Sequence, residues 1–210
     1  MPSTSPPPLA SPFRSAGERA GERERKREAL LLAAVRMFNA RGFNATSLDD
    51  VAASLGVTKP VIYRYLGNKE QVLLECITRG IEQLRAEADS ARRRDGSGLD
   101  RLTAFLRSYA EINMSEFGMC VIRTDEATLS EEGAERFRAL KRGVDTALRA
   151  LIEAGVADGS VVATDVRLTA FTLAGALNWP AHWFRTDGEL SAAELAERMV
   201  ETLLVGLRPR

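Results

Sequence analysis

The residues best suited to chemistry in this 210-residue chain lie close together, between positions 46 and 69. Hydroxyl, cationic and tyrosine side chains alternate there with aliphatic ones at helical spacing. Hydroxyls and cations can bind phosphate oxygens, and side chains on an exposed helix can contact base edges and thymine methyl groups. The stretch therefore favours binding to double-stranded DNA. The candidate residues are Thr46, Ser47, Thr58, Lys59, Pro60, Val61, Tyr63, Arg64, Tyr65 and Lys69.

Two short predicted helices position these side chains. The first is about two turns long and ends at Gly56. Its apolar positions are Leu48, Val51, Ala52 and Leu55. Thr46 is expected to cap it, with Asp49 three positions later as a variant of the capping box. Thr58 is expected to cap the second helix, over about residues 58–65.

A preceding helix, which stops at Arg41 and Gly42, is expected to bury the apolar faces of both short helices. Its apolar stripe is Leu31, Ala34, Val35 and Phe38. Three helices in this order are the parts of a helix-turn-helix module, whose second short helix enters the major groove of DNA. The alternative is a helical hairpin with Tyr63 and Tyr65 in an ordinary core.

The charge distribution supports the first interpretation. The formal net charge is zero, yet residues 23–70 carry nine basic and five acidic residues, a net of +4, and residues 71–210 carry a net of −4. A basic segment in an otherwise acidic chain indicates binding of the basic part to nucleic acid or a membrane.

The run from Ala29 to Leu73 resembles the N-terminal domain of the TetR family of bacterial transcriptional repressors. The matching residues are Phe38, Arg41, Gly42, Phe43, Thr46, Ser47, Val51, Ala52, Gly56, Val57, Thr58, Ile62, Tyr63, Tyr65, Lys69 and Glu70. Leu66 departs from the pattern, because the family commonly has phenylalanine there. The resemblance implies a homodimer of nine or ten helices per chain that binds a pseudo-palindromic operator and carries a ligand pocket in its C-terminal part.

Helical periodicity continues to the end of the chain and predicts an all-α protein of about nine helices. We expect a disordered arm at residues 1–22, which hold five of the eight prolines, a DNA-binding domain at 23–67, and a ligand-binding and dimerisation domain at 68–210. A long helix is expected to start at a capping pattern over residues 68–71. The later helices are predicted at about 99–116, 119–129, 132–154, 164–184 and 191–207.

The ligand pocket is predicted from aromatic, methionine and polar residues of the C-terminal helices, although such side chains also occur in ordinary cores. The candidates are Phe105, Tyr109, Ile112, Asn113, Met114, Phe117, Met119, Arg123, Phe137, Trp179 and Trp183. Pro180 is expected to bend the eighth helix, and Trp179 and Trp183 share one of its faces.

Residues 121–129 and 179–207 look like a TetR subgroup that includes regulators of fatty-acid and steroid catabolism responding to acyl-coenzyme A thioesters. The likeness implies that Arg123, Arg185 or other cations near the pocket mouth meet coenzyme phosphates while the apolar interior takes the acyl part. Wide apolar faces on the last two predicted helices favour a homodimer, the alternative being burial within one chain.

Other classes of function, such as an enzyme or a metal-binding protein, find little support in the sequence. It has no Gly-rich phosphate loop, nucleophile elbow or metal-ligand cluster, and one histidine and two cysteines, so no catalytic residue, cofactor or metal is predicted. The remaining enzyme hypothesis is a helical enzyme acting on a hydrophobic substrate in the C-terminal pocket. Without an apolar run of membrane-spanning length or a signal peptide, we expect a cytoplasmic protein with no membrane partner.

Overall fold

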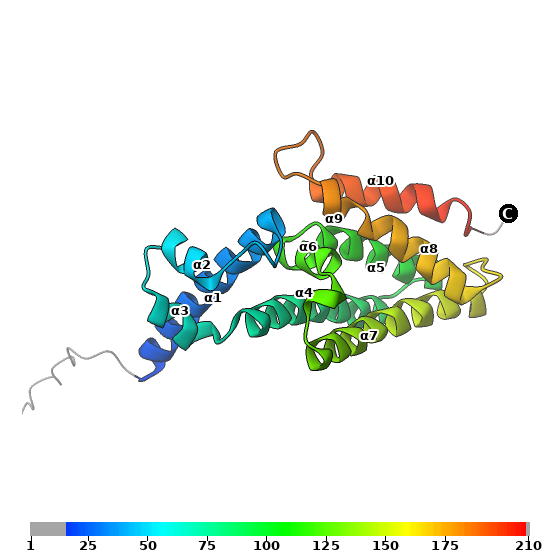
Figure 1. Ribbon diagram of the computed structural model, residues 1–210. Helices are drawn as coiled ribbons and strands as arrows, with labels where there is room; N and C mark the ends of the chain where they lie inside the picture. Colours follow the sequence, from blue (N-terminus) through cyan, green and yellow to red (C-terminus); the bar gives the residue numbers. More distant parts are fainter. Residues whose placement is uncertain (1–15, 209–210) are drawn as a thin grey trace, which may run out of the picture.

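The computed structural model describes residues 16–208, and within that range the chain forms ten α-helices, one 3-10 turn and no strand (Figure 1). The all-α prediction is confirmed. The helices are α1 (Ala16–Arg41), α2 (Leu48–Ser54), α3 (Lys59–Leu66), α4 (Lys69–Arg92), α5 (Gly98–Asn113), α6 (Glu116–Arg123), α7 (Glu131–Ala157), α8 (Val166–Asn178), α9 (Pro180–Trp183) and α10 (Ala192–Leu204), with the 3-10 turn η1 (Glu126–Thr128) before α7.

Figure 1 shows α1, α2 and α3 gathered at one end of the molecule, with α4 leading away from them, α5, α6 and α8 above it in the view and α7 below it. α4 packs on α5, α6 and α7, while α10 packs on α5. α6 also contacts α1, so the C-terminal helices touch the N-terminal group directly as well as through α4. A continuous cluster of buried apolar residues joins the two parts.

The N-terminal group differs from the prediction in three places. Thr58 lies at the N-cap position of α3, but its side chain accepts no capping hydrogen bond. α1 begins at Ala16, so residues 16–22 are helical and not part of a disordered arm; the rest of the predicted arm lies outside the described residues. The cap of α2 is Ser47, which forms a capping box with Asp50, and not Thr46. Thr46 is buried, and its hydroxyl donates to the carbonyl oxygen of Gly42 at 2.9 Å.

Several later helix ends also differ from the prediction. The predicted sixth helix is shorter, because α6 ends at Arg123 and η1 follows. α7 continues through Gly155 instead of ending before it. A Cβ atom on Gly155 would overlap Val161, and one on Gly98 would overlap the backbone of Gly155. Both glycines therefore permit close packing at this point.

The bend expected at Pro180 is a complete break between α8 and α9, which gives ten α-helices where about nine were predicted. Proline has no N–H to donate and cannot continue the hydrogen-bond ladder of α8. The capping pattern over residues 68–71 is confirmed, since Asn68 and Gln71 form a capping box at the start of α4.

Candidate nucleic-acid interface and ligand cavity

One face of α3 is exposed because the other is anchored in the core. Ile62 and Leu66 are buried against the N-terminal helices. The exposed residues are Thr58, Lys59, Pro60, Tyr63 and Arg64, while Val61 and Tyr65 are half-buried. Tyr63 is 43% exposed, which is high for an aromatic residue in a small domain. The structure thus gathers the predicted recognition residues on one surface.

The cations of this surface already have contacts within the chain. The Lys59 ammonium lies 2.7 Å from a carboxylate oxygen of Asp49, and this hydrogen bond raises the pKa of Lys59. It also lies 5.8 Å from the centre of the Tyr63 ring. The Arg64 guanidinium lies 5.4 Å from the centre of the Tyr65 ring. Both cations can exchange these contacts for phosphate.

Lys69 lies beside this surface, at the first residue of α4. Its ammonium is 4.1 Å from the centre of the Phe43 ring and 3.5 Å from the Asn44 carbonyl oxygen, and burial lowers the pKa of Lys69. Ser47 is exposed, but its hydroxyl donates to Asp50 at 2.7 Å. Thr46 is 1% exposed and cannot reach a phosphate, so the predicted contact through its hydroxyl is wrong.

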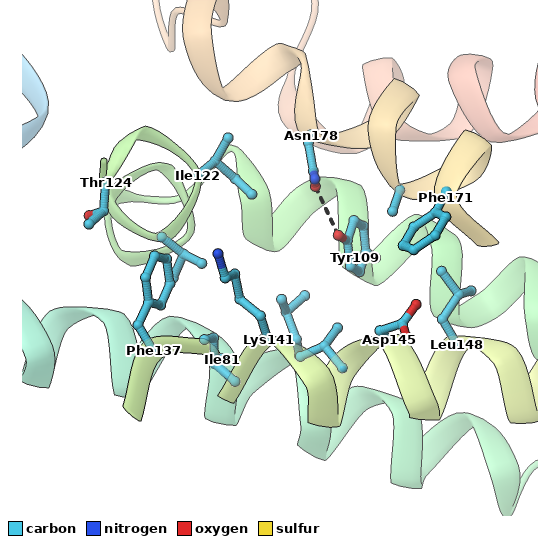
Figure 2. Close-up of a pocket in the computed structure, with 14 residues that line it drawn as sticks. Ile81, Tyr109, Ile122, Thr124, Phe137, Lys141, Asp145, Leu148, Phe171 and Asn178 are labelled. Carbon is cyan, nitrogen blue, oxygen red and sulfur yellow. Dashed lines mark hydrogen bonds between the residues drawn. The ribbon is translucent and has the colours of Figure 1, made fainter. Parts of the chain in front are cut away.

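A cavity of about 290 Å³ lies between α4, α5, α6, α7 and α8 (Figure 2). Most of its wall is aliphatic or aromatic. These residues are Ile81, Leu84, Val121, Ile122, Phe137, Val144, Leu148, Phe171 and Ala174. Its polar residues are Tyr109, Thr124, Lys141, Asp145 and Asn178. An apolar enclosure with a few polar groups is typical of a site for a small organic ligand.

One end of the cavity carries a network of three polar side chains. The Tyr109 hydroxyl donates to Asn178 Oδ1 at 2.8 Å, as Figure 2 shows, and Asn113 Nδ2 donates to the same oxygen at 2.9 Å. Burial raises the pKa of Tyr109, so its hydroxyl remains protonated. Asn113 Oδ1 is buried without a hydrogen-bond partner in the described part of the chain.

α7 contributes two charged residues to the cavity. In Figure 2 the Lys141 side chain points from α7 into the space between Phe137 and Tyr109. Its ammonium lies 4.2 Å from the centre of the Phe137 ring and 3.3 Å from a carboxylate oxygen of Glu126. Asp145, one turn later, is paired with Arg149 at 2.5 Å.

Only some of the predicted pocket residues line the cavity. Tyr109 and Phe137 line the cavity, and Asn113 supports it from behind. The remaining ones within the helical packing do not line it; they are Phe105, Ile112, Met114, Phe117 and Met119. Trp179 and Trp183 are 64% and 48% exposed, contrary to the predicted placement, because Pro180 and Ala181 are the residues of α9 that face inward.

The two arginines expected at a pocket mouth have other partners. Arg123 donates from Nε to the Ala181 carbonyl at 2.6 Å and from Nη1 to the Asn39 carbonyl at 2.8 Å. Arg185 pairs with Asp187 at 2.8 Å on the surface. Neither lines the cavity.

Of the fourteen residues that line the cavity, only Tyr109 and Phe137 were predicted; Lys141, Asp145, Phe171 and Asn178 are the charged, aromatic and amide residues among those that were not. Lys141 gives a usable signal, because it stands in the apolar stripe of Phe137, Val144 and Leu148. Asn178 gives another, as a lone amide at the end of an apolar helix. Charged or amide residues on a buried face require partners, and their position marks a site.

Within residues 16–208, no cluster of three or more histidine, cysteine, aspartate or glutamate side chains could hold a metal ion. None of the helices in this range combines the length and the apolar character that crossing a bilayer requires.

Two family models match the chain. Residues 30–76 match the model described as bacterial regulatory proteins, tetR family, and residues 95–207 match the tetracyclin repressor-like C-terminal domain. The second match alone covers more than half of the chain.

Individual relatives are similar along nearly the whole length. The chain is 30% identical over 202 residues to the HTH-type transcriptional repressor KstR2 of Rhodococcus jostii (strain RHA1), covering 91% of this chain and 95% of the relative. It is 24% identical over 197 residues to the HTH-type transcriptional activator FasR of Mycolicibacterium smegmatis, covering 91% and 88%. The crystal structure of AibR in complex with isovaleryl coenzyme A and operator DNA superposes with a TM-score of 0.73 at 26% identity, covering 84% of this chain and 97% of AibR.

Proposed function

We propose that this chain, which belongs to the TetR family of bacterial regulatory proteins, is a homodimeric cytoplasmic repressor that leaves a pseudo-palindromic operator when a small apolar or acyl-coenzyme A effector binds. Its relatives are transcription regulators and not enzymes. The relative at 30% identity over almost the whole chain is a repressor, which favours repression over activation.

The exposed face of α3 carries this proposal. Lys59, Tyr63 and Arg64 share that face, and the buried Ile62 and Leu66 hold the helix rigidly behind it. Its N-terminal residues Thr58 and Pro60 are positioned to meet base edges when α3 lies in the major groove. Lys69 and Ser47 flank the helix and supply phosphate contacts.

Dimerisation is supported by apolar side chains left exposed on α8 and beside it. Leu168 is 63% exposed, Phe171 52% and Trp179 64%. Contiguous exposed apolar residues on a monomer mark a protein interface, and a two-fold dimer places two α3 helices at operator half-sites. Leu168→Glu is therefore expected to give a monomer in light scattering and to weaken operator binding.

The effector proposal rests on the cavity between α4 and α8 and on the solved relative that binds isovaleryl coenzyme A together with operator DNA. An effector regulates DNA binding only if it binds the released conformation more tightly than the DNA-bound one. α6 and α7 form part of the cavity wall; α6 also contacts α1, and α7 also contacts α4. An occupant of the cavity can therefore bind one conformation of the DNA-binding end more tightly than the other.

A mobility-shift assay with DNA from upstream of the protein's own gene tests the function. The wild type is expected to retard this DNA specifically, and Lys59→Ala and Tyr63→Ala are expected to abolish the retardation. Arg142→Ala is the matched control, because Arg142 is an exposed cation on α7, far from α3 in the sequence. Retention of specific binding by both α3 variants contradicts the assignment of α3 as the recognition helix.

A further inference from the structure

We infer that the cavity takes a short acyl group of at most about ten non-hydrogen atoms and that Asn178 and Lys141 bind its carbonyl end. This inference rests on the proposal that the cavity is the effector site. It adds a limit on chain length and assigns the residues that recognise the polar end.

The limit on length comes from the volume. The cavity measures about 290 Å³, about twice the volume of an engineered cavity of about 150 Å³ that takes benzene, so an occupant of about ten non-hydrogen atoms fits. Leu84, Val144 and Leu148 on its wall favour an aliphatic occupant. A palmitoyl chain exceeds this volume, whereas butyryl, isovaleryl and hexanoyl groups fit.

Asn178 is the donor for the carbonyl oxygen. Its Oδ1 already accepts two hydrogen bonds, from the Tyr109 hydroxyl and from Asn113 Nδ2. These bonds fix the orientation of the amide, so its Nδ2 faces away from Tyr109 and Asn113. Because Asn178 lines the cavity and Nδ2 donates to no acceptor within residues 16–208, its two N–H groups are available to an occupant.

Lys141 supplies positive charge at the mouth of the cavity. Its side chain is 48% exposed, so it can contact both an occupant and solvent. Of the carboxylates near it, Asp145 is paired with Arg149, and Glu126 is shared with Arg138. The ammonium can therefore turn toward an incoming carboxylate, or toward a thioester whose coenzyme remains outside.

Isothermal calorimetry on the full chain tests chain length. The probes are acetyl, butyryl, isovaleryl, hexanoyl, octanoyl and palmitoyl coenzyme A, the corresponding free acids, and coenzyme A alone. Affinity is expected to peak between butyryl and octanoyl and to fall at least about tenfold for palmitoyl. The free acids and the thioesters distinguish the two sources of the acyl group, and either series with this optimum supports the inference.

Two variants test the assigned residues with the best probe. Asn178→Leu is expected to weaken binding about 2- to 13-fold, the range of one neutral hydrogen bond. Lys141→Met is expected to weaken it about tenfold at low salt and less at high salt. Arg142→Met, the neighbouring exposed cation that does not line the cavity, is the matched control. Tyr109→Phe, which removes only the hydroxyl that orients Asn178, serves if Asn178→Leu fails to fold.

The outcomes separate this inference from the proposed function. Tightest binding of palmitoyl coenzyme A, or wild-type affinity in the Asn178 (or Tyr109) and Lys141 variants, overturns the inference and leaves an effector-controlled regulator intact. Equal binding of coenzyme A alone overturns it as well. If no probe binds and operator DNA is still retarded in the presence of all of them, the cavity is not an acyl effector site, and the effector part of the proposed function fails too.

Discussion

At the scale of single residues, Asp49 restrains the cation that is best placed to meet DNA. Its carboxylate lies 2.7 Å from the Lys59 ammonium on the exposed surface. Asp49→Asn removes this charge, so Lys59 pairs with phosphate without first losing a partner. An ion pair exposed to water is weak, so operator affinity is expected to rise by no more than about fivefold. Fluorescence anisotropy with labelled operator at two salt concentrations measures the change.

Asp50→Asn is the comparison for this prediction, because Asp50 is acidic and exposed but contacts Ser47 and not Lys59. An equal rise in both variants means that lower negative charge alone is responsible. A fall in affinity for Asp49→Asn contradicts the role given to Lys59.

Thr46 tests whether a residue within the DNA-binding motif acts on stability alone. Its buried hydroxyl donates to the Gly42 carbonyl at 2.9 Å. Thr46→Val keeps the shape and leaves that carbonyl without this donor, so the free energy of unfolding is expected to fall by about 1–2 kcal/mol. Urea unfolding measures the loss, and the operator affinity of the folded variant should equal that of the wild type. Normal stability with weakened DNA binding restores the phosphate contact predicted from the sequence.

At the scale of elements, Glu70 ties the start of α4 to the start of α7. Its Oε1 accepts the Ser130 backbone N–H at 2.8 Å and the Ser130 hydroxyl at 2.6 Å. A Cβ atom on Gly133 would overlap the same carboxylate, so the glycine permits the close approach. The tie connects a helix that follows the recognition helix directly with a wall of the cavity.

A double-mutant cycle measures the strength of this tie. Glu70→Ala, Ser130→Ala and the double variant are expected to show a coupling energy of about 1–2 kcal/mol in the free energy of unfolding, because one partner is charged. The backbone N–H of Ser130 survives in Ser130→Ala, so the cycle reports the hydroxyl bond. A coupling below about 0.3 kcal/mol means that the Ser130 hydroxyl adds nothing to the tie, which then rests on the backbone N–H bond and on packing.

The same scale shows what the sequence could and could not predict. The starts of α4 and α10 follow from side chains within four residues, since α4 begins at the predicted capping pattern and α10 begins at a capping box of Ser191 and Glu194. The exposed face of α3 that we propose for DNA binding was also predictable, because one short helix supplies most of it. The cavity was not, since its lining comes from five helices that only tertiary packing brings together. The end of α7 was predicted wrongly for the same reason. Gly155 permits close packing against Gly98 and does not end the helix.

At the scale of the whole molecule, α6 joins the cavity to the DNA-binding end. Val121 and Ile122 on α6 line the cavity. At its start, the Glu116 carbonyl accepts a hydrogen bond from Asn39 Nδ2 at 2.8 Å, and at its end Arg123 donates to the Asn39 carbonyl at 2.8 Å. Both ends of α6 therefore bind one residue of α1, and we propose that an effector acts on the N-terminal helices by displacing α6.

Arg123→Met tests this transmission, because it removes the hydrogen bonds to Asn39 and Ala181 and keeps an unbranched side chain. Without effector, the operator affinity of the variant is expected to stay within about threefold of the wild-type value. Saturating effector lowers operator affinity by a certain factor, and in the variant this factor is expected to be about 2- to 30-fold smaller than in the wild type. Anisotropy titrations with and without effector give the factor, and Arg142→Met should leave it unchanged.

Because coupling is reciprocal, calorimetry must show the same reduced factor in effector affinity when operator is added. An undiminished factor in a variant that melts at the wild-type temperature means that α6 moves without Arg123, and that α4 and its tie to α7 carry the signal instead.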